Sequence, residues 1–279
     1  LYKLNKTFWQ LKHSLIYNLS LTKKIMKKIG ILTSGGDCGG LNAAIRSIFF
    51  RAKNKYGMSV FGIKNGTTGF LQRPLDYIEL TKETFSGYLL KQGGTFLGTT
   101  NKASTINSLD LNGKLIDQST IIINGYHQLG LDGLIIIGGD GSMQILQALA
   151  KKGNLNIVAI PKTIDNDVGA TESSIGFDTA VQVATQALDN LHSTAVSHSR
   201  SMILEVMGRD AGHIALSSGI AGGADIILLP EIKYSIKGII NKLDDMKKKN
   251  LNHSLAVVAE AVKKENGEKV IHKFKDGQK

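Results

Sequence analysis

The sequence predicts an α/β protein built from strand–helix–strand units around parallel β-sheet, either as two domains or as one large domain. Short apolar runs alternate with longer amphipathic segments, which is the pattern of repeated strand–helix–strand units. The apolar runs are continuous, as is typical of strands buried on both faces of a parallel sheet. Glycine-rich turns follow several of the runs. A chain of 279 residues with 42% hydrophobic residues can bury a large core, enough for two domains or for one large α/β domain.

The strands are expected where the apolar runs are shortest and richest in Ile, Leu and Val. They are Ile29–Thr33, Val60–Ile63, Leu134–Ile137, Ile157–Ile160, Met202–Val206, Ile226–Leu229 and Leu255–Ala259. Helices are expected at Leu41–Lys55, Met143–Lys151 and Thr179–Thr194. In the last of these, Val181, Ala184, Leu188 and Leu191 recur at helical spacing, so we interpret this stripe as core, and Asp178 fits the N-cap position.

We divide the chain into a first domain at residues 26–176 and a second at residues 177–279. Residues 1–25 carry Lys but no acid, and we interpret them as a basic extension outside the fold. Met26 leads directly into the first strand and resembles a natural start. The last stretch, Lys263–Lys279, is polar and has no closing element, so we expect the chain to be cut short.

Composition excludes several classes of function. The formal net charge is +11, but no stripe of Lys and Arg is interleaved with aromatic residues, so we expect no nucleic-acid partner. No apolar run reaches the ~18 residues of a membrane span. The only cysteine, Cys38, excludes an internal disulfide and favours a reducing, cytoplasmic setting. No accompanying pattern of His and Asn indicates a thiol enzyme.

Three glycine turns follow predicted strands, at Ser34–Asn42, Gly138–Ser142 and Met207–Gly212. In open α/β sheets, ligands bind beyond the carboxyl ends of the strands, and a turn that leads into a helix offers free N–H groups to an anion. Neither the P-loop pattern nor the Gly-x-Gly-x-x-Gly fingerprint is present. The turns therefore predict a phosphate site of another kind.

An acidic motif, Pro161–Val168, follows the second glycine turn. In an extended segment, Asp165 and Asp167 would point to the same side, where a carboxylate can accept a hydroxyl proton. Asp140, between two glycines, is placed to hold Mg²⁺ together with substrate phosphates. Arg200 and Arg209 flank a predicted strand and suit phosphate binding. Together these residues predict phosphoryl transfer to a hydroxyl acceptor.

These segments resemble the 6-phosphofructokinase family, in its bacterial type, from Met26 to the end of the chain. The matching segments are Leu32–Asp37, Gly93–Gly98, Ile137–Ser142, Pro161–Asp167, Ile175–Ala180, Glu205–Arg209 and Ala221–Gly223. The resemblance implies a glycolytic kinase that transfers the γ-phosphoryl group of ATP, with Mg²⁺, to the 1-hydroxyl of fructose 6-phosphate. It also implies a fold of two doubly wound, Rossmann-like parallel-sheet domains, and a homo-oligomer, usually a tetramer. Residues 26–176 would then bind the nucleotide and residues 177–279 the sugar phosphate.

The resemblance also implies a role for each matched residue. Asp165 would be the proton acceptor, beside Asp167, and Thr163 would steer the transferring phosphoryl group. The nucleotide phosphates and Mg²⁺ would be held by Gly36, Asn101, Lys102, Gly139, Asp140, Gly141 and Ser142, with Asp140 on the metal. The sugar phosphate would be held by Met207, Gly208, Arg209 and Glu260, and by Arg200 reaching into a neighbouring subunit.

Two departures keep alternatives open. Lys162 resembles the pyrophosphate-using branch, whereas Gly141 stands where that branch carries Asp and leaves room for a nucleotide. The first alternative is therefore a pyrophosphate-dependent phosphofructokinase. The second is a truncated, non-catalytic homologue that serves as a binding or regulatory subunit, because the C-terminal sugar-phosphate ligands of the family lie beyond residue 279. The matched site residues favour the ATP-dependent kinase.

Overall fold

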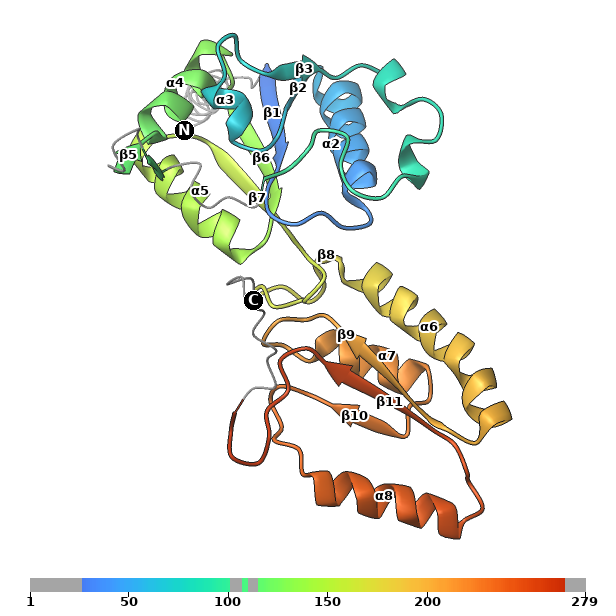
Figure 1. The fold of residues 1–279 in the computed structure, drawn as a ribbon. Coiled ribbons are helices and arrows are strands. Elements are labelled where there is room, and N and C mark those ends of the chain that lie inside the picture. The colour runs from blue at the N-terminus through green and yellow to red at the C-terminus, as the bar shows by residue number, and fades with distance from the viewer. Residues whose placement is uncertain (1–26, 101–106, 110–114, 269–279) are drawn as a thin grey trace, which may run out of the picture.

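The computed structural model describes residues 27–100, 107–109 and 115–268. They form two lobes, each with its own parallel sheet and flanking helices (Figure 1). The predicted fold class is confirmed. Every predicted strand is present, and its ends lie within three residues of the expected ones.

The first lobe contains a six-stranded sheet of order β3-β2-β1-β6-β7-β8. Its strands are β1 (Lys28–Thr33), β2 (Ser59–Ile63), β3 (Tyr77–Glu79), β6 (Gly133–Gly138), β7 (Ile157–Thr163) and β8 (Ile175–Gly176). All neighbours are parallel except β2 and β3. β1 lies in the middle, where Ile31 is paired with Gly62 on one side and Ile135 on the other.

Helices cover both faces of this sheet. α2 (Leu41–Tyr56) packs on one face, and α4 (Ser119–Gln128) and α5 (Asp140–Gly153) pack on the other (Figure 1). Adjacent residues of β1 illustrate the arrangement, because Ile31 and Leu32 are both fully buried but belong to opposite core clusters. Side chains alternate across a strand, so a strand covered on both faces must be apolar throughout.

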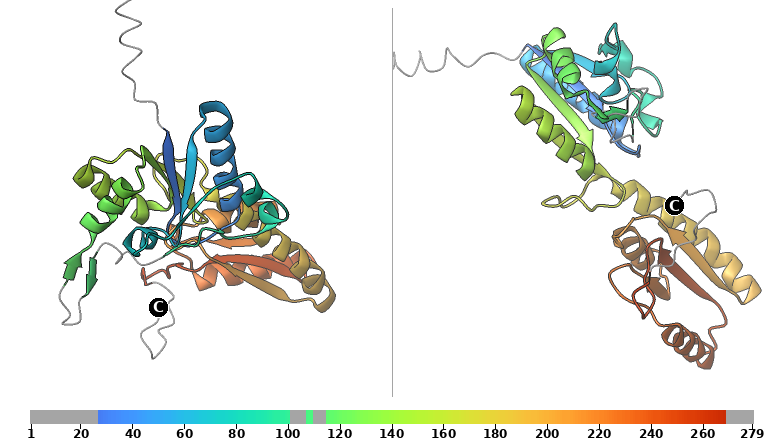
Figure 2. Two further views of the ribbon diagram at one scale, coloured as in Figure 1. Left: turned by 90° about the horizontal axis from the view of Figure 1, so that it is seen from above. Right: turned by 60° about the vertical axis from the view of Figure 1, so that its left-hand side comes forward.

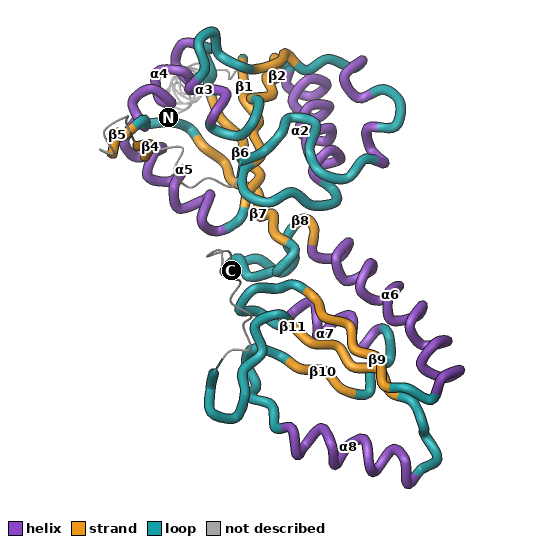
Figure 3. Tube along the Cα trace, in the orientation of Figure 1, coloured by secondary structure: helices purple, strands orange, loops and turns teal. Residues whose placement is uncertain are grey.

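The second lobe is smaller. Its sheet has the order β10-β11-β9, formed by β9 (Ser201–Val206), β10 (Ile226–Leu228) and β11 (Ser254–Ala259), all parallel. α6 (Phe177–His198) and α7 (His213–Ala221) pack together against this sheet, and α8 (Ile236–Lys248) lies beside β10 (Figure 3). The core includes Leu188 of α6, as the helical stripe predicted, with Ala215 and Val257.

The remaining elements are short, and the sequence patterns did not predict them. They are α3 (Thr68–Leu71), the 3₁₀ turns η1 (Glu83–Phe85) and η2 (Leu89–Lys91), and the antiparallel pair β4 (Asn107–Leu109) and β5 (Leu115–Asp117). α4, α7 and α8 were also not predicted. Within the described residues, no helix is long and apolar enough to cross a membrane.

Two predicted helix starts are wrong. α5 begins at Asp140 rather than Met143, because the extended Gly139 is its N-cap and Asp140 occupies the first turn, where a carboxylate favours the helix dipole. Likewise, Asp178 is not the N-cap of α6. Gly176 holds that position at φ 108, a conformation that suits glycine, and Asp178 lies in the first turn.

β7, β8 and the start of α6 connect the lobes, as the turned view also shows (Figure 2). The loop between β7 and β8 contains the acidic motif. The boundary predicted after Gly176 stays a prediction.

Candidate active site

The first two glycine turns meet at the carboxyl edge of the first sheet, because β1, β6 and β7 are neighbours there. The Ser34 hydroxyl donates to Ser142 Oγ at 3.0 Å, which joins the turn after β1 to the turn after β6. A side chain on Gly138 would come within 3.0 Å of Ser142 and 3.4 Å of the Ser34 carbonyl oxygen. The two turns therefore approach so closely that glycine is required between them.

The segment before Thr100 closes the same edge from the side of β1. Thr33 Oγ1 donates to the Gly98 carbonyl at 2.8 Å, and Thr99 Oγ1 donates to the Gly35 carbonyl at 2.6 Å. The Gly35 amide in turn donates to the Thr100 carbonyl at 3.0 Å. Asn101 and Lys102, the predicted nucleotide ligands that follow, lie outside the described residues.

Lys162, near the end of β7, extends its ammonium group into the first glycine turn. Its side chain is 4% exposed, and its Nζ donates to the carbonyl of Gly36. Burial lowers the pKa of this ammonium, and the neighbouring Cys38, Asp37 and Asp165 act in the opposite direction. A buried cation at the meeting point of two anion-binding turns adds positive charge where the sequence predicts phosphates.

Cys38 lies in the same turn. Its Sγ donates to the Ile175 carbonyl at 3.4 Å. Burial raises the pKa of the Cys38 thiol to about 11, so the thiol stays protonated at neutral pH. This environment does not favour a nucleophilic thiol.

The acidic motif does not continue β7 in an extended conformation, so the argument from strand alternation is wrong. β7 ends at Thr163, Asp165 lies in a turn, and Asn166 has a left-handed conformation with φ 53. Thr163 Oγ1 accepts the backbone N–H of Asp165 at 3.1 Å. The turn buries Asp165, which is 6% exposed, and leaves Asp167 exposed.

Asp165 nevertheless lies among charges from both lobes. Burial raises the pKa of its carboxyl, and Asp167 raises it further. Arg209 lowers the same pKa and Glu260 raises it, so charges of the second lobe act on the Asp165 carboxyl. A raised pKa makes a carboxylate a stronger base, which suits it to accept a proton from a hydroxyl group.

The third glycine turn holds Arg209 at the carboxyl end of β9. Arg209 is left-handed at φ 54, and Gly208 has φ 145, which only glycine adopts readily. Glu260, directly after β11, accepts the Arg209 amide at 2.6 Å and the Gly208 amide at 3.3 Å through one oxygen. Glu231 accepts the amide of Gly212 at 2.8 Å, so carboxylates hold both ends of the turn.

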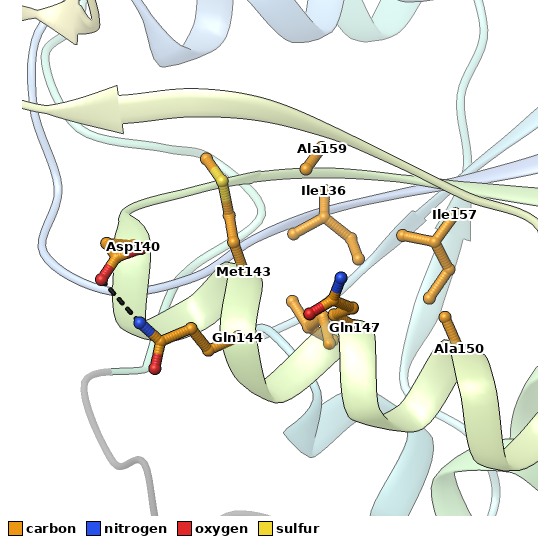
Figure 4. A pocket seen from close by; sticks show the side chains of 9 residues that line it. Ile136, Asp140, Met143, Gln144, Gln147, Ala150, Ile157 and Ala159 are labelled. Atoms are coloured by element: carbon orange, nitrogen blue, oxygen red, sulfur yellow. Dashed lines mark hydrogen bonds between the residues drawn. The ribbon is translucent and has the colours of Figure 1, made fainter. Parts of the chain in front are cut away.

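Asp140 lies exposed in the first turn of α5, where its Oδ2 accepts Gln144 Nε2 at 2.8 Å. Beside it, a cleft of about 390 Å³ runs between α5 and β7, with Met143 and Gln147 on the helix and Ala159 on the strand (Figure 4). The described residues contain no group of three or more His, Cys, Asp or Glu that could hold a metal. One exposed carboxylate beside phosphate-binding turns fits Mg²⁺, which takes one or two carboxylates plus substrate phosphates.

The structure brings most of the predicted residues into two groups. Gly36, Gly139, Asp140, Gly141 and Ser142 lie at the edge of the first sheet, and Met207, Gly208, Arg209 and Glu260 lie at the edge of the second, with Thr163, Asp165 and Asp167 on the connection between the lobes. Arg200 does not join them, because it precedes β9 whereas Arg209 follows it, and a strand of this length separates them by roughly 20 Å. Its expected role towards a neighbouring subunit stays a prediction.

Three structural roles were not predicted from the sequence, those of Glu231, Ser174 and Lys162. Each of these residues acts on a backbone group distant in sequence, such as Gly212 for Glu231 and Gly36 for Lys162. Of these three residues, only Lys162 was conspicuous in the sequence, because it is a cation inside an otherwise acidic motif.

Fold and site together define the class as a doubly wound α/β protein with glycine turns at the carboxyl edges of its sheets and a buried carboxyl group on the connection between two lobes. A family model described as Phosphofructokinase matches residues 28–279. The chain is 56% identical over 245 residues to ATP-dependent 6-phosphofructokinase 1 of Synechocystis sp., covering 88% of this chain and 68% of that protein. It is 46% identical over 255 residues to ATP-dependent 6-phosphofructokinase 2 of Clostridium perfringens, covering 90% and 69%. The chain belongs to the phosphofructokinase family.

Solved structures agree. Phosphofructokinase from Saccharomyces cerevisiae matches with a TM-score of 0.73 and 29% identity, over 88% of this chain and 35% of that chain. Pyrophosphate-dependent phosphofructokinase from Nitrosospira multiformis matches with a TM-score of 0.74, over 87% and 62%. At 22% identity the second match shows the fold alone. This chain thus spans about two thirds of the length of its curated relatives and about a third of the yeast chain.

Proposed function

We propose that this chain carries the site of an ATP-dependent 6-phosphofructokinase, which transfers the γ-phosphoryl group of ATP to the 1-hydroxyl of fructose 6-phosphate. The observation that carries the proposal is the place of Asp165. It is a buried carboxyl group with a raised pKa, between the phosphate-binding edge of one lobe and Arg209 of the other. Its curated relatives are named as ATP-dependent enzymes.

In this proposal Asp165 accepts the proton of the attacking hydroxyl group, and Arg209 with the backbone of Met207 and Gly208 orients the sugar phosphate. Because phosphoryl transfer depends mainly on positioning and on neutralisation of charge, a site made of backbone amides and cations suffices. The hydroxyl oxygen of Thr163 accepts the backbone N–H of Asp165, and in this proposal the hydroxyl group steers the transferring phosphoryl group.

The nucleotide phosphates would lie over Gly36, Gly139, Gly141 and Ser142, at the N-terminus of α5. Asn101 and Lys102 would complete this side of the nucleotide site. Asp140 would hold Mg²⁺, which when bound neutralises charge on the phosphates. Gly141 supports a nucleotide, because no atom lies within 4 Å of the position that its Cβ would take.

A homo-oligomer, in which Arg200 reaches a neighbouring copy, is also part of the proposal, as is a cytoplasmic setting for the free thiol of Cys38. One observation favours pyrophosphate as an alternative donor, namely the buried ammonium of Lys162 at the phosphate edge. The phosphoryl donor that the chain uses distinguishes the ATP-dependent from the pyrophosphate-dependent enzyme. Product formation from fructose 6-phosphate and Mg²⁺ is measured with ATP and, separately, with pyrophosphate, and Asp165→Asn is the control that removes the proton acceptor.

A further inference from the structure

Asn166, between the two acids of the motif, ties down the loop that follows it. Its Nδ2 donates to the carbonyl of Glu172 at 3.1 Å, and its Oδ1 accepts the backbone N–H of Ser174 at 2.9 Å. The left-handed φ of 53 directs the chain into this closed loop, and Asn is one of the few residues that adopt the conformation readily. Both polar atoms of the Asn166 side chain are therefore hydrogen-bonded to backbone groups of this loop.

Ser174 attaches the far end of the loop to the strand that carries the site. Its side chain is 3% exposed, and its Oγ donates to the Thr163 carbonyl at 2.6 Å, with Asn166 Oδ1 at 3.1 Å as a second acceptor. Thr163 in turn accepts the Asp165 amide. The backbone of Asp165 is thus held on both sides, by its hydrogen bond to Thr163 and by its peptide bond to Asn166, and Ser174 is hydrogen-bonded to both of these residues.

These hydrogen bonds lie where the lobes join. Ser174 immediately precedes β8, whose Ile175 pairs with Lys162 and whose Gly176 pairs with Thr163. α6 of the second lobe begins at the next residue, Phe177. The loop is attached to a strand of the first lobe and to the first helix of the second. A shift of the loop would therefore move Asp165 relative to both groups of predicted phosphate ligands.

We propose that Asn166 and Ser174 are positioning residues, which clasp the 166–174 loop onto the end of β7 and so hold the Asp165 carboxyl in place to accept a proton. The proposal rests on the proposed function of Asp165. Neither residue touches substrate in this account. A misplacement of about 1 Å can reduce turnover roughly a hundredfold, so hydrogen bonds behind the proton acceptor matter to its efficiency.

Two variants of the full chain remove the clasp from opposite sides. Asn166→Gly keeps the left-handed backbone accessible and deletes only the amide, whereas Ser174→Ala deletes only the hydroxyl. Ser173→Ala, the same change at the exposed neighbouring residue, is the matched control. We expect both clasp variants to lower kcat with ATP about tenfold or more, with KM values for fructose 6-phosphate and ATP within about twofold of the parent chain. The Ser173→Ala variant keeps the parent kcat.

A second readout needs no turnover. The carboxyl of Asp165 is titrated by NMR in chains labelled with ¹³C at Asp, and Asp165→Asn assigns the signal. Because burial raises the pKa of Asp165 in the parent chain, release of the loop admits water and lowers that pKa in both clasp variants. Where Ser174→Ala does not fold, Ser174→Cys replaces it, since a thiol has nearly the same shape as the hydroxyl group and is a much weaker hydrogen-bond donor.

The outcomes separate the two proposals. Folded clasp variants whose Asp165 titrates as in the parent chain, and whose kcat is unchanged, overturn the positioning role. A parent chain that turns over neither donor refutes the proposed function, and the titration of Asp165 then still decides whether the clasp controls its environment. A rise in both KM values with unchanged kcat also contradicts the proposal, because it indicates a substrate-binding role.

Discussion

Glu260 Oε1 accepts the backbone N–H of Arg209 at 2.6 Å, so a residue after β11 fixes the turn that follows β9. The same oxygen accepts the Gly208 amide. Sequence resemblance assigns Glu260 to the sugar phosphate, and the structure adds that its carboxylate already supports the backbone of a second predicted ligand. The two strands are adjacent in the sheet, which explains how residues so distant in sequence meet.

Glu260→Ala is expected to destabilise the chain by about 1.5–3 kcal/mol, because it leaves two amides without their charged acceptor. Glu260→Gln keeps an acceptor oxygen, so its free energy of unfolding is expected to fall by less than about half of that amount. Urea unfolding of both variants measures the difference. Equal losses in the two variants would mean that the hydrogen bonds to the turn contribute little.

Arg209→Met is expected to move the acid limb of the pH dependence of kcat/KM to higher pH. Activity requires ionised Asp165 and is lost as the pH falls through its pKa, and Arg209 lowers that pKa. The position of the limb, rather than its height, is the measurement, since the variant also weakens sugar-phosphate binding. Arg51→Met, at an exposed position of α2, is the control and leaves the limb in place.

Asp165→Asn is expected to abolish turnover and to stabilise the fold at pH 7. The folded-state pKa of Asp165 is raised, so its contribution to stability is present at low pH and is lost as the pH rises through that pKa. The variant should therefore unfold at a higher Tm than the parent chain at pH 7. The gap should narrow as the pH falls towards the ordinary value of 3.8, and a gap independent of pH would contradict the account.

Gly141→Asp is expected to fold normally and to lose turnover with ATP by more than about tenfold. No atom lies within 4 Å of the added Cβ, and an acid in the first turn of α5 favours the helix dipole, so the fold tolerates the change. The new carboxylate would instead repel the nucleotide phosphates. Gly141→Ala, which adds bulk without charge, is the control, and its kcat/KM with ATP is expected to stay within about threefold of the parent. An Asp variant that keeps full turnover with ATP would remove Gly141 from the nucleotide site.

The fold was largely predictable from the sequence because its buried strands are continuous apolar runs. Ile31 and Leu32 face opposite core clusters, and only a strand covered on both sides requires both to be apolar. Short elements such as β3 lack such a signal. Helix α8 lacks it too, because its Ile236 is 63% exposed and its Ile240 is 50% exposed. α8 is positioned by its neighbours in the fold rather than by a fully buried apolar stripe.

The site was predictable by residue type and less so by geometry. Glycines and acids at the ends of strands marked the correct edges of the sheets. The local conformation was not predictable, because Asn166 takes a left-handed φ that ends the alternation on which the pairing of Asp165 and Asp167 was based. The supports of the site were not predictable either, since Ser174 and Glu231 act through backbone groups that only the folded chain brings close.

In the proposed function, Asp165 is the proton acceptor of a kinase whose phosphoryl donor is ATP. The measurement that tests it most directly is formation of fructose 1,6-bisphosphate from fructose 6-phosphate and Mg²⁺, with ATP and pyrophosphate supplied in separate reactions and Asp165→Asn run beside the parent chain. The account predicts turnover with ATP alone, abolished in the variant. Turnover with pyrophosphate alone would show that Lys162 rather than Gly141 marks the donor, and a folded parent chain silent with both donors would contradict the claim that this chain is catalytic.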